Sequence, residues 1–596
     1  MSSKPKTQLQ VFLLIGSTIV CLVLAGCDDG KDEMRRVRRE QQRRNDVRAG
    51  QAEHLADIFD LLGRYNELNE REASRQLIYH LAQWNPDSFE EKKVAANSSW
   101  VTLEKTLETG LDQEKARDRA ESARFLKSDV SHLRDAFVFN RIANWVDTPE
   151  HDDPLFAEWV ESFEAEERRQ VRTMLRLFDW CVRNIAPEPL SPRDPVPRPP
   201  QLTDGLQYRG AGYRQTAYQC VWRGSGDGLQ LAHVFMHLCR QANLPAAMLA
   251  TLRDNGRYMP WSVGVLVGES IYLFDPVIGH PIVGPGGIGV ATLSEARKDA
   301  SVLRRMTVPG FFDYPTSKSD IPQSIAMLPL LPETTSDRMR RLQSSLTGEK
   351  RLVAYVDAQK QGELFDEVSG IAGVRLWPVP LQAEVYERDI AASENLDLQF
   401  KVYQQTRFSY LELDIVPSEE LANGRWYHLM GDFAGDEIDA RPGARAMYLT
   451  RRAPEFEIAD LRTDVDLQKA YGVRRSLGTS PEEYDRQIQQ IQSLLRSAKR
   501  TATYWLGLVQ YDDASYETAQ SWFTKRLIDD PPQWRWYPSA IYNAARTAER
   551  LGDAKEAERW YKEDANGRPH ASRLRLRMTG RTKAVGSGEP ENDPSQ

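Results

Sequence analysis

The N-terminal part of the chain shows the apolar spacing of amphipathic helices. Apolar residues recur every three or four positions over residues 55–84 and again over residues 168–185. Because an α-helix completes a turn in about 3.6 residues, this spacing places them on one face. Asn85 and Pro86 break the pattern between helical stretches, as proline does in a helix. We therefore expect a helical region over residues 51–165.

A glycine turn leads into a further helix at residues 226–245, which read GDGLQLAHVFMHLCRQANLP. One face of this helix is apolar; it carries Leu231, Val234, Phe235, Leu238 and Cys239. Residues 261–276 then hold two β-rich runs around Gly268 and end at Asp275 and Pro276. Such runs predict a β-hairpin. The predicted order is a turn, a helix and a hairpin.

The pattern is mixed between residues 301 and 465. Two runs rich in β-formers, 351–357 and 374–381, flank a helical stretch at 360–371, which predicts a small unit of strand, helix and strand. Three further stretches suit strands or helices; they are 408–415, 424–433 and 444–452. Trp377 and Trp426 could line a groove, but tryptophans of this kind are more typical of a packed core. We expect a small α/β region here.

Two helical units follow one another in the C-terminal third. Small and aromatic residues stand at Gly507, Ala519 and Phe523, and again 38 positions later at Ala545, Ala557 and Tyr561. This pattern resembles the tetratricopeptide repeat, in which small residues lie at a helix crossing and an aromatic ring fills the next turn. An unrelated antiparallel helix pair is the alternative. We expect a disordered tail over residues 576–596.

Composition limits the classes of function. The chain has 596 residues, a formal net charge of −8 and 41% hydrophobic residues. This length suggests three to five globular domains. Basic and acidic residues are mixed along most of the chain, so no domain-wide basic face is available for nucleic acid. Nucleic-acid binding is therefore not expected.

The first residues have the pattern of an export signal. Lys4 and Lys6 precede an apolar run from Val11 to Leu24 that is short for a membrane span. The run ends in Leu24, Ala25, Gly26 and Cys27, which resembles the lipobox of bacterial lipoproteins. The resemblance implies cleavage after residue 26 and attachment of a diacylglycerol and fatty acyl groups such as palmitate to Cys27. An ordinary signal peptide or an uncleaved anchor is the alternative.

The residues after Cys27 indicate where such a protein would stay. In lipoproteins of double-membrane bacteria, an aspartate after the lipidated cysteine favours retention in the inner membrane, and Asp28 stands there. Residues 27–50 are rich in arginine and form a charged tether, either near lipid head groups or simply solvated. The expected location is the bacterial cell envelope, lipid-anchored at the periplasmic face of the inner membrane.

The turn, helix and hairpin, ending in Asp-Pro, resemble the core of the transglutaminase-like superfamily. This is a papain-related α+β fold in which a Gly-Asp-Cys turn starts a helix, His-x-Trp opens a strand and Asp-Pro closes the next. The resemblance covers roughly residues 170–285. It implies a thiol nucleophile, a histidine base and an aspartate that orients the base.

Two of these three groups are missing from this sequence. Gly226 and Asp227 match the turn, but Gly228 stands at the position of the nucleophile. Trp261 matches the tryptophan of His-x-Trp, which places Met259 where the histidine belongs. Asp275 alone remains, and a carboxylate with no imidazole to orient generates no nucleophile. We expect it to be a turn residue at a strand end.

Other residues could replace the missing groups. His280, just after Asp-Pro, is the best outside candidate for a base, although a loop histidine beside glycine and proline is typically exposed. Cys220 and Cys239 are distant in sequence from the start of the helix and are expected to be structural, like Cys181. His233 and His237 have the i, i+4 spacing of metal ligands, but no third ligand is evident. We expect no metal and no cofactor.

The sequence thus predicts an α+β multidomain protein with a helical N-terminal region, a papain- or transglutaminase-like core, a small α/β middle region and C-terminal helical repeats. The predicted divisions are a signal peptide 1–26, a tether 27–50, a helical region 51–165, a transglutaminase-like domain 166–300, an α/β region 301–465, repeats 466–575 and a tail 576–596. The expected role is non-catalytic: a scaffold bound to the membrane by its lipid and to a protein or peptide partner by its repeats. The alternative is an amide hydrolase or acyltransferase with a non-standard active site.

Overall fold

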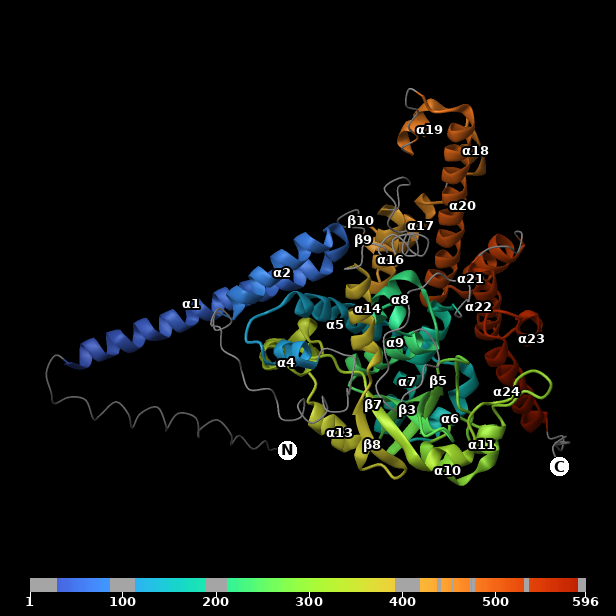
Figure 1. Ribbon diagram of the computed structural model, residues 1–596, viewed down its shortest axis with the longest axis horizontal. Coiled ribbons are helices and arrows are strands. Elements are labelled where there is room, and N and C mark those ends of the chain that lie inside the picture. Colours follow the sequence, from blue (N-terminus) through green and yellow to red (C-terminus); the bar gives the residue numbers. More distant parts are fainter. Residues whose placement is uncertain are drawn as a thin grey trace, which may run out of the picture.

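Two helical parts project from a central body in the computed structural model of the chain (Figure 1). The structure describes residues 29–85, 113–188, 212–391, 419–436, 441–452, 454–471, 473, 478–529 and 535–587. The predicted signal peptide, Cys27 and Asp28 lie outside these residues, as does the stretch 408–415. None of the helices in the described ranges combines the length and the hydropathy that crossing a membrane requires.

The N-terminal helices form a hairpin that extends away from the body (Figure 1). The hairpin consists of α1 (Asp29–Gly63) and α2 (Glu70–Trp84). Buried leucine and isoleucine side chains hold the two helices together; they are Ile58, Leu62, Leu77 and Leu81. Asn69 caps α2 by accepting a hydrogen bond from the backbone N–H of Glu72. The helices that follow are α4 (Gln113–Glu121), α5 (Lys127–Val146), α6 (Ala157–Glu161) and α7 (Ala165–Asn184).

The central body contains a six-stranded sheet in the order β6-β5-β4-β3-β7-β8. Its first strands are β3 (Ala246–Leu252), β4 (Tyr258–Val267), β5 (Ser270–Asp275) and β6 (His280–Pro281), all antiparallel. The predicted hairpin is confirmed, with Gly268 at φ 57° in its turn. The predicted helix is also confirmed as α9 (Gly228–Gln241), preceded by α8 (Ala217–Arg223). Helix α9 packs against β3 and β4, and α7 packs against β4.

The middle region extends this sheet. Strand β7 (Ser324–Leu328) pairs with β3, and β8 (Ile371–Leu376) runs parallel to β7. Helix α13 (Ala358–Asp366) precedes β8, as predicted. The predicted strand at 374–381 is a strand only up to Leu376, because helix α14 (Val379–Ala391) begins three residues later. The predicted strand at 351–357 is wrong: this segment is not a strand. Its backbone N–H groups at Val353 and Ala354 donate to the side chains of Gln241 and Gln343 instead of a neighbouring strand.

Two stretches for which the sequence pattern did not decide between strand and helix are helical. Residues 424–433 fall largely in α16 (Glu419–Met430), and residues 444–452 in α17 (Ala444–Thr450). Trp377 and Trp426 are buried in the core, as expected. The remaining helices are α10 (Leu293–Lys298), α11 (Ala300–Arg304), α12 (Asp337–Ser345), α14 (Val379–Ala391), α18 (Glu455–Asp460) and α19 (Val465–Ala470). Four short strands form two further pairs: β1 (Ala186–Pro187) with β2 (Ser225–Gly226), and β9 (Gly435–Asp436) with β10 (Arg441–Pro442).

The C-terminal helices pack one against the next along one side of the body (Figure 1). They are α20 (Pro481–Asp512), α21 (Tyr516–Phe523), α22 (Tyr537–Arg550), α23 (Ala554–Glu563) and α24 (Pro569–Ser587). Gly507 of α20 lies directly against the ring of Phe523, so a small residue meets an aromatic one at this crossing. Helix α24 continues to Ser587 and buries Met578. The disordered tail expected from residue 576 is therefore helical over its first part, because its apolar residues pack on the body.

The C-terminal helices and the sheet share one hydrophobic core. A row of alternating buried charges also joins the C-terminal helices to α7 and to the turn before Pro154. It runs through Asp512, Arg183, Asp179, Arg546, Asp153, Arg575 and Glu549. These side chains come from α20, α7, α22, α24 and the turn before Pro154. The fold is thus mixed α+β: α7 and α9 pack on the central sheet, and the C-terminal helices join this body through α22 and α7.

Candidate functional site

The turn before α9 is closely hydrogen-bonded. The carboxylate of Asp227 accepts the backbone N–H of Gln230 at 2.9 Å, and the side chain of Gln230 accepts the N–H of Asp227 at 3.0 Å. This reciprocal capping box fixes the start of the helix. The side chain of Gln215 donates to the same Gln230 oxygen at 2.8 Å and to the carbonyl of Ser225 at 2.8 Å. The turn is therefore rigidly held.

The position expected for the nucleophile is filled by another part of the chain. A Cβ atom at Gly228 would lie 2.5 Å from Cγ2 and 2.8 Å from Cα of Val277, closer than real Cβ contacts come. Since one of these atoms belongs to the backbone, a different rotamer of Val277 would not clear the space. The first turn of α9 consequently has no room for a cysteine unless the segment after β5 moves.

Asp275 is fully buried, and its carboxylate is occupied by structural hydrogen bonds. One oxygen accepts the backbone N–H groups of Val277 and Ile278, at 2.9 and 3.1 Å. The other oxygen accepts the hydroxyl of Tyr314 at 2.8 Å, and Nε1 of Trp261 donates to that hydroxyl at 2.8 Å. Asp275 therefore holds in place the turn that carries Val277 against Gly228, in agreement with the role expected from its sequence position.

Met259 and His280 do not supply the missing base. Met259 lies in β4 opposite Thr251 of β3 and is half-buried. His280 is 1% exposed, so the expectation of an exposed loop histidine is wrong. Its Nδ1 donates to the carbonyl of Pro281 at 2.6 Å, and its ring lies beside that of Phe156. Burial lowers the pKa of His280 to about 4.

The three cysteines in the described residues, Cys181, Cys220 and Cys239, are free and buried. Cys220 is nearer to the turn than its sequence position suggested, because its Sγ lies beside Gly226. Burial raises the pKa of Cys181 and of Cys239 well above the ordinary value for a thiol. A reactive thiol needs the opposite, a lowered pKa and access to solvent.

His233 and His237 pack together inside the core. Their Nε2 atoms are 3.1 Å apart, and both side chains are buried. The ring of His237 stacks on Phe139, and that of His233 lies edge-on to Trp377. Burial lowers the pKa of His233 to about 3, which keeps it neutral. Within the described ranges no third His, Cys, Asp or Glu joins this pair, so it is a packed pair as the sequence favoured.

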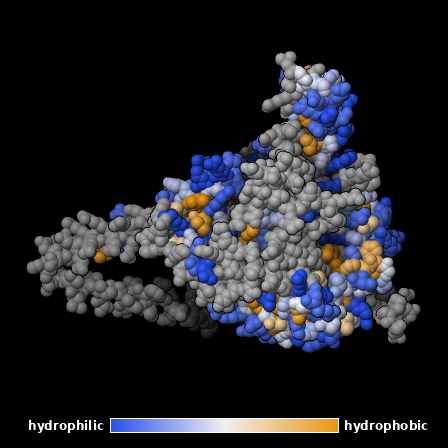
Figure 2. Space-filling view, viewed as in Figure 1, coloured by the Kyte–Doolittle hydropathy of each residue, from blue (hydrophilic) through white to orange (hydrophobic). Residues whose placement is uncertain are grey.

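A groove opens where the C-terminal helices meet the segment before α6. It encloses about 350 Å³ and is lined by Pro154, Leu155, Glu549, Gly552, Ala554, Ala557, Glu558, Tyr561, Lys562, Leu576, Thr579 and Gly580. Most of this lining is apolar, and the acidic side chains in it have basic partners: Glu558 pairs with Lys562, and Glu549 with Arg546 and Arg575. Figure 2 shows hydrophobic side chains gathered on this side of the molecule, over the C-terminal helices.

Ala557 and Tyr561, which the repeat-like spacing singled out, are buried and line this groove. Pro154 and Leu155 also line the groove, although they are about 400 positions earlier in the chain. No local pattern in the sequence marks these two residues, because they reach the groove only through the packing of α22 and α24 against the body.

In comparisons with known proteins, no family model, no curated protein and no solved structure matches the chain.

Proposed function

We propose that this chain is a non-catalytic binding or scaffold protein of the bacterial cell envelope, in which a transglutaminase-like fold has become a structural module. The contact between Gly228 and Val277 carries this proposal. A thiol enzyme of this fold needs a side chain at the first turn of α9, with space above it for a substrate. Here a backbone atom fills that space, and Asp275 is used to keep it filled.

Binding of a partner is supported by the groove of the C-terminal helices. Helical repeats of the tetratricopeptide kind use such concave surfaces for peptides, and the lining here offers an apolar recess with paired charges at its edge. Among the described residues that line the groove, the charged side chains Glu549, Glu558 and Lys562 all have ionic partners. The occupant that suits this lining is a peptide segment of a partner protein that inserts an apolar side chain between Leu155 and Leu576.

The membrane anchor is proposed from the sequence alone, on the apolar run and the LAGC ending. It is compatible with the described structure, in which α1 begins at Asp29 and projects away from the body (Figure 1). A lipid on Cys27 would then lie two residues before Asp29, next to the outer end of the described helix. Mass spectrometry of the membrane-extracted protein, compared with a Cys27→Ala variant, tests this part of the proposal.

The first experiment separates the scaffold from the alternative enzyme. The folded chain is incubated with an acyl-donor probe that labels reactive thiols, and each cysteine is then mapped. We expect no labelling of Cys181, Cys220 or Cys239 until the protein is unfolded. Labelling of Cys220 alone in the folded protein, together with amide hydrolysis that a Cys220→Ser variant loses, would establish the enzyme instead.

The second experiment tests the groove. Gly580 lines it, and a Cβ there would meet no atom within 4 Å, so Gly580→Trp adds a bulky side chain without straining the helix backbone. We expect this variant to lose the envelope partners that the wild-type chain retains in a crosslinking pulldown. The control Ser344→Trp adds the same side chain at an exposed position of α12, away from the groove, and should retain them. Equal recovery with both variants would contradict binding at the groove.

A further inference from the structure

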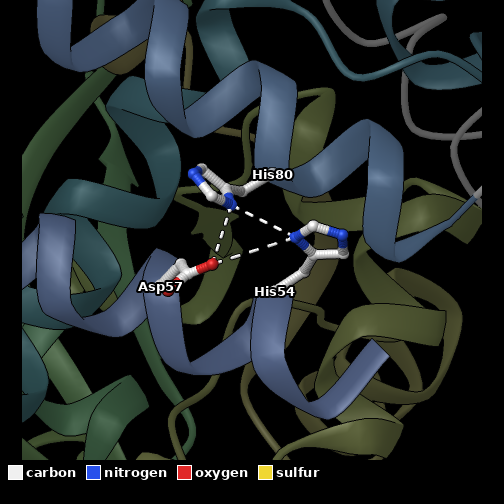
Figure 3. Close-up of side chains that lie close together, drawn as sticks. All are labelled: His54, Asp57 and His80. Carbon is white, nitrogen blue, oxygen red and sulfur yellow. Dashed lines mark hydrogen bonds and ion pairs between the residues drawn. The ribbon is translucent and has the colours of Figure 1, made fainter. Parts of the chain in front are cut away.

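Three potential metal ligands converge between the two helices of the N-terminal hairpin. His54 and Asp57 lie one turn apart on α1, and His80 lies on α2 opposite them (Figure 3). The Nδ1 atoms of the two histidines are 3.3 Å apart. A carboxylate oxygen of Asp57 is 3.1 Å from Nδ1 of His80 and 3.9 Å from Nδ1 of His54. The three atoms therefore form a small triangle whose sides are 3.1, 3.3 and 3.9 Å.

The size of this triangle suits a metal ion. A point equidistant from the three atoms would lie about 2.0 Å from each of them, which is close to the length of Zn–N and Zn–O bonds in proteins, about 2.0–2.2 Å. The spacing of the three ligand atoms therefore already matches the spacing around a bound ion. Two imidazoles and one carboxylate are also a ligand set that Zn²⁺ prefers.

Protons satisfy this arrangement less well than a cation does. If Nδ1 of His80 donates its proton to Asp57, Nδ1 of His54 carries either a lone pair that receives no proton of its own or a proton whose nearest carboxylate oxygen in the triangle is 3.9 Å away. If Nδ1 of His54 donates to His80 instead, the lone pair on His80 is used and the carboxylate of Asp57 faces it without a proton between them. A positive ion at the centre is attracted to all three atoms at once.

The hairpin holds the ligands in place without the ion. Ile58 and Leu62 of α1 are buried with Leu77 and Leu81 of α2, and the side-chain amide of Gln51 donates to the carbonyl of Trp84 at 3.1 Å. The ligand side chains retain 21–45% of their exposure, so solvent reaches the site. We propose that His54, Asp57 and His80 bind Zn²⁺ through these three atoms, with a fourth position open to water.

The proposal has a structural consequence that is independent of the groove and of the proposed function. Because His54 and Asp57 belong to α1 and His80 to α2, the ion would crosslink the hairpin close to the point where α1 extends past the end of α2 (Figures 1 and 3). Bound zinc stabilises the state that contains the preformed site, so it should raise the temperature at which this hairpin melts.

Zinc titration of the full chain after treatment with EDTA tests the site. We measure the affinity by isothermal titration calorimetry, and the geometry by the visible spectrum of Co²⁺ bound in place of Zn²⁺. The variants His80→Gln and Asp57→Asn each remove one ligand, and each should weaken zinc binding at the strongest site at least about tenfold. A loss of about tenfold is the lower end of what is seen even when only a residue that orients a ligand is removed. Asp60→Asn is the matched control, since Asp60 lies one turn further along α1, pairs with Arg64 and is outside the cluster.

Circular dichroism of the metal-free variants establishes that the hairpin still forms. With folding intact, loss of zinc affinity in both ligand variants but not in Asp60→Asn supports the site. If wild type, His80→Gln and Asp57→Asn bind Zn²⁺ with the same affinity and stoichiometry, or if the wild type binds none at micromolar concentration, the proposal is wrong. Because two ligand variants are compared, a folding defect in one of them leaves the other to decide.

Discussion

Arg183 and Asp512 are 329 positions apart in the chain, yet their side chains form a fully buried ion pair at 2.8 Å. Asp512 also accepts hydrogen bonds from Asn184 and from Nε2 of His428. Burial by itself would raise the pKa of Asp512, but the charge of Arg183 and the bond from His428 outweigh it and lower that pKa. The last turn of α20 is thereby fixed to α7 beneath the sheet, which couples the C-terminal helices to the core.

Removing the charge of Asp512 should destabilise the whole protein. Breaking one partner of a buried ion pair leaves an uncompensated charge and costs about 3–5 kcal/mol, so we expect Asp512→Asn to lower the free energy of unfolding in urea by this order. The neighbouring Asp513 offers the control, because its pair with Arg445 is partly exposed and such pairs contribute about 1 kcal/mol or less. Equal losses in Asp512→Asn and Asp513→Asn would show that burial of the pair is not what matters.

Introducing a cysteine at Gly228 should not create a reactive thiol. Its side chain would overlap Val277, and overpacking of this kind costs about 1–3 kcal/mol. We therefore expect Gly228→Cys to be less stable in urea and unreactive toward acyl donors. Gly362→Cys introduces a thiol in α13 where the nearest atom to a Cβ is 3.9 Å away, and it should keep wild-type stability. A stable, acylated Gly228→Cys protein would mean that the turn after β5 opens readily.

The free energy of unfolding should decrease as the pH is lowered below the ordinary pKa of histidine. His280 has a folded-state pKa of about 4 against 6.5 for the free side chain, so between these values the unfolded chain binds a proton that the folded chain does not. Its contribution to stability is complete above about pH 6.5 and is lost as the pH falls toward 4. For one histidine the slope is at most about 1.4 kcal/mol per pH unit.

The variant His280→Asn isolates this contribution. Its unfolding free energy should be lower at pH 7.5, because the bond to Pro281 is altered, but should decline less steeply between pH 6 and pH 5. Urea titrations at several pH values measure both quantities. Parallel pH profiles for wild type and variant would show that the folded state accepts a proton on His280.

Alanine at Gly507 should destabilise a helix that alanine normally favours. Replacing glycine by alanine inside a helix gains about 1 kcal/mol from backbone propensity, but a Cβ at Gly507 would lie 2.5 Å from the ring of Phe523. We expect the melting temperature of Gly507→Ala to fall by several degrees. Gly580→Ala, where the Cβ meets nothing within 4 Å, should keep or raise it. A rise in both variants would show that α20 and α21 are not closely packed at this crossing.

Local patterns were sufficient for the elements around the turn. The apolar face of α9 and the alternation around Gly268 depend only on neighbouring residues, and both elements were predicted correctly. The segment 351–357 was wrong because β-propensity does not reveal whether a partner strand exists; here Gln241 and Gln343 take the place of that partner. The segments that form α16 and α17 contain aromatic residues, which are common in strands, so the sequence pattern was compatible with a strand or a helix.

The site depended on contacts that no local pattern contains. The absence of a thiol at Gly228 was readable, but its closure by Val277 follows from how the turn after β5 folds over α9. The burial of His280 likewise involves a residue distant in sequence, Phe156. Cys220, by contrast, reaches Gly226 through the short turn after α8. His54 and Asp57 do have the i, i+3 spacing of helix-borne ligands, yet only the pairing of α1 with α2 brings His80 to them.

Helix α1 is continuous over 35 residues, which at a rise of 1.5 Å per residue makes it about 52 Å long. Residues 29–50 of the charged stretch that the sequence suggested as a tether thus form the outer part of a rod, and residues 51–63 form the inner part, which is packed on α2. A helix of this kind keeps a fixed length, whereas the two ends of a flexible linker vary in their separation. The length of α1 therefore sets the distance between the body, with its groove, and anything attached to the outer end of the helix. The body can rotate about that end but cannot come closer to it.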